Sequence, residues 1–197
     1  NSLQIIRLVS SLGQDLADGE LLQLSNVSNH SFSETVYFDV IRKKTAALFA
    51  ACTEAAAYSV GVSEEEVKLA RLLGEYIGIC FQIKDDIFDY FDSKEIGKPT
   101  GNDMLEGKLT LPVLYALNRA NDNQAAEIAL KVKEGTATLA EIARLIAFTK
   151  ENGGIEYAVR TMNAYKQKAF GLLASLPDSA ICVALRSYLD YVVDREK

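Results

Sequence analysis

The chain has 197 residues, of which 49% are hydrophobic and 24% charged, a balance that argues against a disordered protein. Its 27 acidic and 21 basic residues give a net charge of −6, and no basic face is evident, which argues against nucleic acid as a partner. No apolar run reaches the roughly 18 residues of a transmembrane helix, so we expect no transmembrane segment.

Apolar residues recur at intervals of three and four along the chain and only three prolines interrupt it, which predicts an all-α fold. The S/T-x-x-E spacing of a capping box begins at Ser31, Ser63 and Thr138 and predicts helix starts there. The helices are expected at about 3–25, 32–60, 64–92, 110–120, 123–134, 138–150, 154–176 and 179–194. No linker or change in composition separates them, so we expect residues 1–197 to belong to a single all-helical domain.

The predicted helix 64–92 has an unusual second half, "GEYIGICFQIKDDIFDYF", which is apolar nearly all round. Such a helix is expected to be buried by its neighbours. Gly74 and Gly78 lie four residues apart on it and would let a neighbouring helix approach closely.

Aspartates gather at the end of this apolar stretch. On a continuous helix, Asp85, Asp89 and Asp92 fall on one stripe, with Asp86 to one side. Carboxylates that project together from a buried helix repel one another and lose hydration, unless cations compensate them. Oxygen-only ligands favour a hard divalent ion such as Mg²⁺. The alternative is a solvated acidic face at the helix end, although negative charge there opposes the helix dipole.

The polar segment that follows, "DSKEIGKPTGNDMLEGK", is punctuated by glycine and carries Lys94, Lys98 and Lys108. Solvated loop lysines are one interpretation. Lysines so placed could also meet an anionic group held at a metal on the aspartates. Together with the apolar interior, these features indicate a site for a diphosphate ester with a hydrocarbon tail.

The three cysteines, Cys52, Cys80 and Cys182, are far apart in sequence and form no C-x-x-C pair. Each lies in an apolar helical pattern, so we predict reduced thiols in the core rather than disulfides. Reduced thiols are typical of the cytoplasm, and a cytoplasmic protein is expected.

A long pattern identifies a family resemblance. The stretch "GICFQIKDDIFDYFDSKEIGKPTGNDMLEGKLTLPVLYAL" resembles the second aspartate-rich region of trans-type isoprenyl diphosphate synthases, the polyprenyl synthetases. The family pattern is F-Q-x-x-D-D-x-x-D, a spacer, and G-K-x-x-G-x-D-x-x-E-G-K-x-T-L-P. Upstream, "IRKKTAALFAAC" is similar to the K-T-A-x-L-F helix of the family, and "DLADGELLQL" resembles its segment ending in G-E-x-x-Q-L. The resemblance implies an all-α helical bundle of the isoprenoid synthase type.

The resemblance also implies roles for individual residues. It implies that Asp85 and Asp89 bind Mg²⁺ and that Asp86 supports the same metal cluster. The diphosphate of the allylic substrate would be bound by Lys44, Lys98 and Lys108, with hydrogen bonds from Thr45 and Gln82. Among these, the catalytic set would be Lys44, Asp85, Asp86 and Lys98. The implied reaction is Mg²⁺-dependent condensation of isopentenyl diphosphate with an allylic prenyl diphosphate, in an enzyme that we expect to be a homodimer.

One part of the family pattern is absent. The family has two aspartate-rich motifs, and residues 1–80 contain no D-D-x-x-D. We therefore expect the chain to be the C-terminal portion of a synthase, with the N-terminal helices of the bundle missing, and to be inactive alone. The alternatives are a non-catalytic relative that binds a prenyl diphosphate, or a partner subunit. A terpene cyclase of the same fold is disfavoured by "GKPTGNDMLEGKLTLP", which matches the chain-elongating branch.

Overall fold

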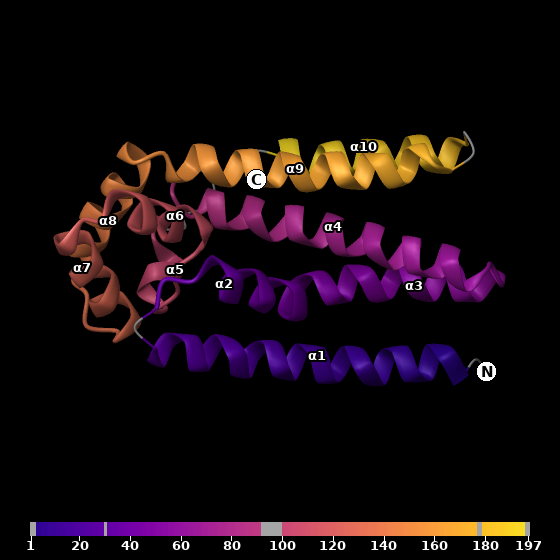
Figure 1. Cartoon of the computed structure of the whole chain (residues 1–197), viewed down its shortest axis with the longest axis horizontal. Helices are drawn as coiled ribbons and strands as arrows, with labels where there is room; N and C mark the ends of the chain where they lie inside the picture. Colours follow the sequence, from indigo (N-terminus) through magenta and orange to yellow (C-terminus); the bar gives the residue numbers. More distant parts are fainter. Residues whose placement is uncertain (1–2, 30, 92–99, 177–178, 196–197) are drawn as a thin grey trace. The chain divides into compact units, whose positions relative to one another are not determined.

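The computed structural model describes residues 3–29, 31–91, 100–176 and 179–195, and all regular structure in these ranges is helical (Figure 1). The all-α prediction is therefore confirmed. The elements are α1 (Leu3–Ser28), α2 (Glu34–Ile41), the π-helical turn η1 (Arg42–Ala46), α3 (Ala47–Val60), α4 (Glu64–Phe88), α5 (Asn102–Leu105), α6 (Leu111–Ala120), α7 (Asn123–Lys133), α8 (Leu139–Glu151), α9 (Gly154–Ala174) and α10 (Ala180–Asp194).

The helices divide into two compact units. Unit 1 comprises Asn1–Leu21, Asp39–Gln82 and Met162–Lys197, and unit 2 comprises Leu22–Phe38 and Ile83–Thr161. Helices α1, α2, α4 and α9 have residues in both units. The single domain expected from the sequence stays a prediction.

Each predicted helix has a counterpart, and the differences are at the ends. The predicted helix 32–60 is continuous but contains the π-helical turn, and α5 was not expected. Helix α4 ends at Phe88 and not at residue 92, because Tyr90 N and Phe91 N donate to carbonyls three residues back and tighten the last turn. The cap of α2 is Ser33 rather than Ser31, since the Ser33 hydroxyl accepts from Val36 N at 3.3 Å.

The other two capping boxes are confirmed. The Thr138 hydroxyl accepts from Glu141 N, and the Glu141 carboxylate accepts from Thr138 N. At the start of α4, Ser63 N donates to the Glu66 carboxylate at 2.9 Å, and Glu66 N donates to the Ser63 hydroxyl at 3.3 Å. Each pair satisfies backbone donors that have no partner within the helix.

In unit 1, α3 and α4 pack closely through the two glycines of α4. A Cβ atom on Gly74 would lie 2.5 Å from the carbonyl oxygen of Phe49, and one on Gly78 would lie 2.6 Å from Cα of Ala46. Both distances are too short for any side chain. The predicted close approach of a neighbouring helix at these glycines is therefore confirmed.

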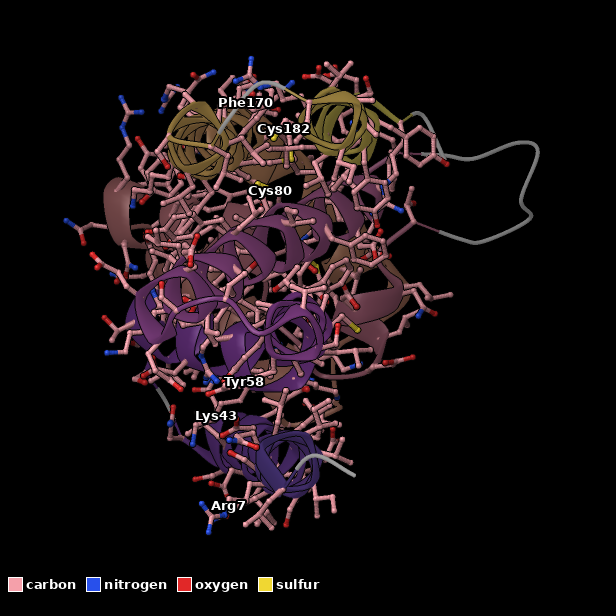
Figure 2. The ribbon with its side chains drawn as sticks, turned by 90° about the vertical axis from the view of Figure 1, so that its right-hand side faces the viewer. Arg7, Lys43, Tyr58, Cys80, Phe170 and Cys182 are labelled. Carbon is pink, nitrogen blue, oxygen red and sulfur yellow. The ribbon has the colours of Figure 1, made fainter. Side chains whose placement is uncertain are left out.

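The cysteines of unit 1 occupy different environments. Cys80 and Cys182 are buried free thiols, and Figure 2 shows both in the interior of this unit. Burial raises the pKa of the Cys80 thiol to about 12, so that it stays protonated. Cys52 is also a free thiol, but it is exposed. The prediction of a core position was wrong for Cys52. Small apolar residues lie on the outward face of α3 as well as on its inward face, so the apolar pattern did not distinguish the two faces.

In unit 2, α7 holds a buried lysine. Lys133 is 5% exposed, and its ammonium group donates to the carbonyl oxygen of Asn29 at 2.7 Å, the side-chain oxygen of Asn29 at 3.2 Å and the carbonyl oxygen of Ser31 at 2.9 Å. The three acceptors match the three ammonium hydrogens of lysine. Asn29 and Ser31, which lie between α1 and α2, are thereby attached to α7.

Among the described residues, no helix is both long enough and apolar enough to cross a lipid bilayer.

Candidate functional site

In unit 1, the predicted site residues lie on the π-helical turn and on α4. Thr45 belongs to η1, and its hydroxyl donates to the side-chain oxygen of Gln82 at 2.7 Å. The two residues are 37 positions apart in sequence and each is half-buried. The structure therefore brings together the two side chains that the family resemblance assigned as hydrogen-bonding groups.

Lys44 precedes Thr45 in the same turn and contacts a different helix. Its ammonium nitrogen lies 2.5 Å from a carboxylate oxygen of Glu20 on α1. The side chains of Lys44 and Glu20 are 37% and 51% exposed, so the ion pair is accessible to solvent. An exposed pair of this kind contributes little to stability, about 0–1 kcal/mol.

In unit 2, the aspartate pair Asp85 and Asp86 occupies the last turn of α4. Asp86 is 3% exposed and accepts a hydrogen bond of 2.5 Å from the hydroxyl of Tyr37 on α2, which is 6% exposed. Burial, followed by the negative charge of Asp86, raises the pKa of Tyr37 well above its usual value. The phenol thus stays protonated and donates to the buried carboxylate. Asp85 is half-buried.

Asp89 lies just past the end of α4, in the turn that leaves the helix. Its two carboxylate oxygens accept from the backbone N–H groups of Asn102 at 2.9 Å and Asp103 at 3.1 Å. Its carbonyl oxygen also accepts from Gly101 N at 2.9 Å. Three consecutive backbone donors are therefore satisfied by this one residue. Helix α4 ends one residue earlier, but Asp89 N still donates to the carbonyl oxygen of Asp85 at 3.3 Å, so Asp89 keeps its predicted place one turn after Asp85.

Lys108 closes the loop that begins at Gly101. Its backbone N–H donates to the carbonyl oxygen of Asp103 at 2.8 Å, and its ammonium group pairs with the Glu106 carboxylate. A Cβ atom on Gly107 would lie 3.4 Å from the carbonyl oxygen of Val132 on α7, so the loop packs on that helix. The remaining predicted site residue, Lys98, and also Asp92 and Lys94 lie outside the described residues.

The donor chemistry of this segment suits a hard cation. The functional atoms of Asp85, Asp86 and Asp89 are carboxylate oxygens, the ligands that Mg²⁺ prefers. Asp86 and Asp89 also accept hydrogen bonds, and such bonds orient carboxylates that serve as metal ligands. Within the described ranges, no three acidic, histidine or cysteine side chains gather as they would around a metal ion. The Mg²⁺ assignment therefore stays a prediction.

Sequence reasoning missed two residues that contact the predicted site. Tyr37 was not singled out, since a tyrosine between apolar residues indicates core packing. Glu20 lies in the segment "DLADGELLQL" that resembled the family, but it was not singled out. A signal existed for Glu20, because it was the acidic residue of the G-E-x-x-Q-L pattern.

Comparison with known proteins agrees with this pattern. The sequence profile described as polyprenyl synthetase matches residues 1–149. An octaprenyl diphosphate synthase of Haemophilus influenzae is 37% identical over 195 residues, which are 98% of this chain and 59% of that protein. A heptaprenyl diphosphate synthase component 2 of Geobacillus stearothermophilus is 34% identical over 183 residues, which are 92% of this chain and 56% of that protein. The chain thus spans somewhat under two thirds of the length of these relatives.

Solved structures show the same fold. The crystal structure of a geranylgeranyl pyrophosphate synthase from Bacteroides thetaiotaomicron is 80% identical, with a TM-score of 0.96 over 99% of this chain and 65% of that chain. A polyprenyl synthase from Caulobacter crescentus, complexed with calcium and isoprenyl diphosphate, is 33% identical, with a TM-score of 0.90 over 100% of this chain and 60% of that chain. The architecture is therefore that of isoprenoid synthases, and the chain belongs to the polyprenyl synthetase family.

Proposed function

We propose that this chain contributes the second aspartate-rich half of the diphosphate site of an enzyme that elongates prenyl chains. The observation that carries the proposal is the profile match over residues 1–149, which includes both the K-T-A turn and the D-D-x-x-D segment. The reaction is the condensation of isopentenyl diphosphate with an allylic prenyl diphosphate, with Mg²⁺ as the metal. A cytoplasmic homodimer is part of the same proposal.

In this proposal, the metal is held by Asp85, Asp86 and Asp89. A bound metal would neutralise the negative charge of the leaving diphosphate. The ammonium groups of Lys44 and Lys108 bind the diphosphate oxygens, and their charge stabilises the negative charge that develops as the allylic C–O bond ionises. Thr45 and Gln82 supply hydrogen bonds to the same group. Lys98 is included on its sequence position alone.

The apolar character of α4 supports the next step. Its interior side chains, among them Ile79 and Ile83, are fully buried. A water-free interior protects an allylic cation until the double bond of isopentenyl diphosphate attacks it and a proton is lost. Because these 197 residues hold one of the two aspartate-rich motifs that the resemblance implies, we expect no condensation by the 197-residue chain alone.

The test is a condensation assay with radiolabelled isopentenyl diphosphate, using a longer protein that joins these residues to a segment with the first aspartate motif. Asp85→Ala is expected to lose most turnover while its circular dichroism is unchanged. Asp194→Ala is the matched control, since the Asp194 side chain is 70% exposed and pairs only with Lys166 among the contacts described. Unchanged turnover in Asp85→Ala would refute the site assignment.

A partner-subunit role is the second candidate, because the Geobacillus relative is named a component of its synthase. Retained diphosphate binding without condensation, in every longer protein tested, would favour that role over catalysis.

A further inference from the structure

An acidic segment of α1 packs directly against the π-helical turn that carries Lys44. The segment is Asp18–Gly19–Glu20, and the contact lies within unit 1. A Cβ atom on Gly19 would lie 2.9 Å from Cβ of Lys43 and 3.0 Å from the backbone nitrogen of Lys44. Any larger residue at Gly19 would push the two elements apart. The backbones are therefore in close contact at this point.

Ion pairs flank this close contact on both sides. Glu20 pairs with Lys44 at 2.5 Å, and Asp18 pairs with Lys43 at 3.5 Å. Figure 2 shows Lys43 on the side of its turn that is nearest α1. Each carboxylate of the segment thus lies beside one lysine of the turn, but only Lys44 belongs to the K-T-A motif.

Two adjacent side chains of the π-helical turn contact different helices. Thr45 donates to Gln82 on α4, whereas the preceding Lys44 reaches Glu20 on α1. A π-helical turn inserts an extra residue into the helix and is common at functional sites. The Lys44 ammonium group is thus paired with a carboxylate of α1, which Glu20 provides.

We propose that Glu20 is the counter-ion of Lys44 that an incoming diphosphate has to displace. The proposal rests on the proposed function, in which Lys44 binds the diphosphate. Glu20 acts through Lys44 and is therefore a positioning residue. It keeps the ammonium group near α1 when no anion is bound, and it competes with the diphosphate for the same group.

The consequence is a measurable effect on anion affinity. Removing the charge of Glu20 removes one competitor for the Lys44 ammonium group, and exposed ion pairs of this kind correspond to a factor of roughly two to five. Glu20→Gln should therefore bind inorganic diphosphate about two to five times more tightly than the unmodified chain. Asp18→Asn is the matched control, because it removes an equivalent charge from the same segment but faces Lys43.

The experiment is isothermal titration calorimetry of the 197-residue chain with inorganic diphosphate in the presence of MgCl₂. The variants are Glu20→Gln, Asp18→Asn, Lys44→Met and the double variant Glu20→Gln/Lys44→Met. The expected result is tighter binding for Glu20→Gln, little change for Asp18→Asn, weaker binding for Lys44→Met, and no gain from Glu20→Gln when Lys44 is absent. Glu20→Ala serves as a second variant, and circular dichroism checks the fold of each.

The possible failures are distinguishable. If Lys44→Met binds as well as the unmodified chain, the role of Lys44 in the proposed function is wrong and the inference is wrong with it. If Lys44→Met is weakened but Glu20→Gln matches Asp18→Asn, the inference alone is overturned. If Glu20→Gln gives the same gain with and without Lys44, the effect is general repulsion, and the counter-ion role is likewise overturned.

Discussion

Replacing Asp89 by asparagine should release the loop that carries Lys108. The carboxylate uses both oxygens, one for Asn102 N and one for Asp103 N. Asparagine keeps the shape but offers one acceptor oxygen, and its NH₂ group would face the second backbone donor. Hydrogen bonds to a charged acceptor contribute about 1.5–3 kcal/mol each. Losing one and weakening the other should cost about 2–4 kcal/mol of local stability.

The assay is amide hydrogen exchange of residues 101–108. A loss of about 2–4 kcal/mol in the free energy of local opening should speed exchange there by roughly 30- to 1,000-fold. The matched control is Asp122→Asn, because Asp122 caps α7 with one oxygen, which accepts from Ala125 N at 2.9 Å. Asparagine caps a helix as well as aspartate does, so this variant should leave exchange unchanged.

Equal exchange rates at residues 101–108 in Asp89→Asn and the unmodified chain would refute the reasoning. They would mean that the packing of the loop on α7, and not the carboxylate, holds it in place. A similar acceleration in Asp122→Asn would also refute it, since the effect would then follow from a general loss of stability in unit 2.

Two further predictions concern single side chains of unit 2. Tyr37→Phe removes the hydrogen bond to the buried Asp86 carboxylate. In urea titrations, we expect the free energy of unfolding to fall by about 1–3 kcal/mol. An unchanged unfolding midpoint would contradict the importance of this bond. The pKa of Glu141 is lowered from 4.5 to about 2 by the hydrogen bonds that its carboxylate makes with Lys131 and Thr138. The contribution of Glu141 to stability is therefore present above pH 4.5 and is lost as the pH falls from about 4.5 to about 2. Glu141→Gln should flatten the stability profile in that range, and an unaltered acid profile would show that the lowered pKa has no counterpart in folding.

Local interactions made much of the fold predictable. The helices follow from apolar residues spaced at three and four, and the capping boxes at Ser63 and Thr138 follow from a partner three residues away. The close approach at Gly74 and Gly78 also follows from local spacing, because a helix presents such residues on one face. In each case, residues within one or two helical turns determine the outcome.

Contacts between distant segments were not predictable in the same way. The Tyr37 hydroxyl reaches Asp86 across 49 positions, and a tyrosine in an apolar run has no feature that names its partner. The π-helical turn at Lys44 has no sequence signal that we recognised. For Asp89, the sequence pattern predicted a metal ligand but did not indicate that two backbone N–H groups, of Asn102 and Asp103, donate to its carboxylate. The family pattern predicted site residues but did not indicate the partners of their side chains.

Three oxygen atoms of Asn29 and Ser31 accept hydrogen bonds from the Lys133 ammonium group. This arrangement resembles an ion-binding loop, except that the cation is part of the protein. Oxygen atoms of Asn29 and Ser31 surround one positive charge, as they would surround a dissolved cation. Because α7 supplies that charge, the cation cannot be diluted, exchanged or chelated, and the contacts of Asn29 and Ser31 need no dissolved ion. The fit is also specific to a compact ammonium group, since the planar guanidinium of arginine directs its donors differently.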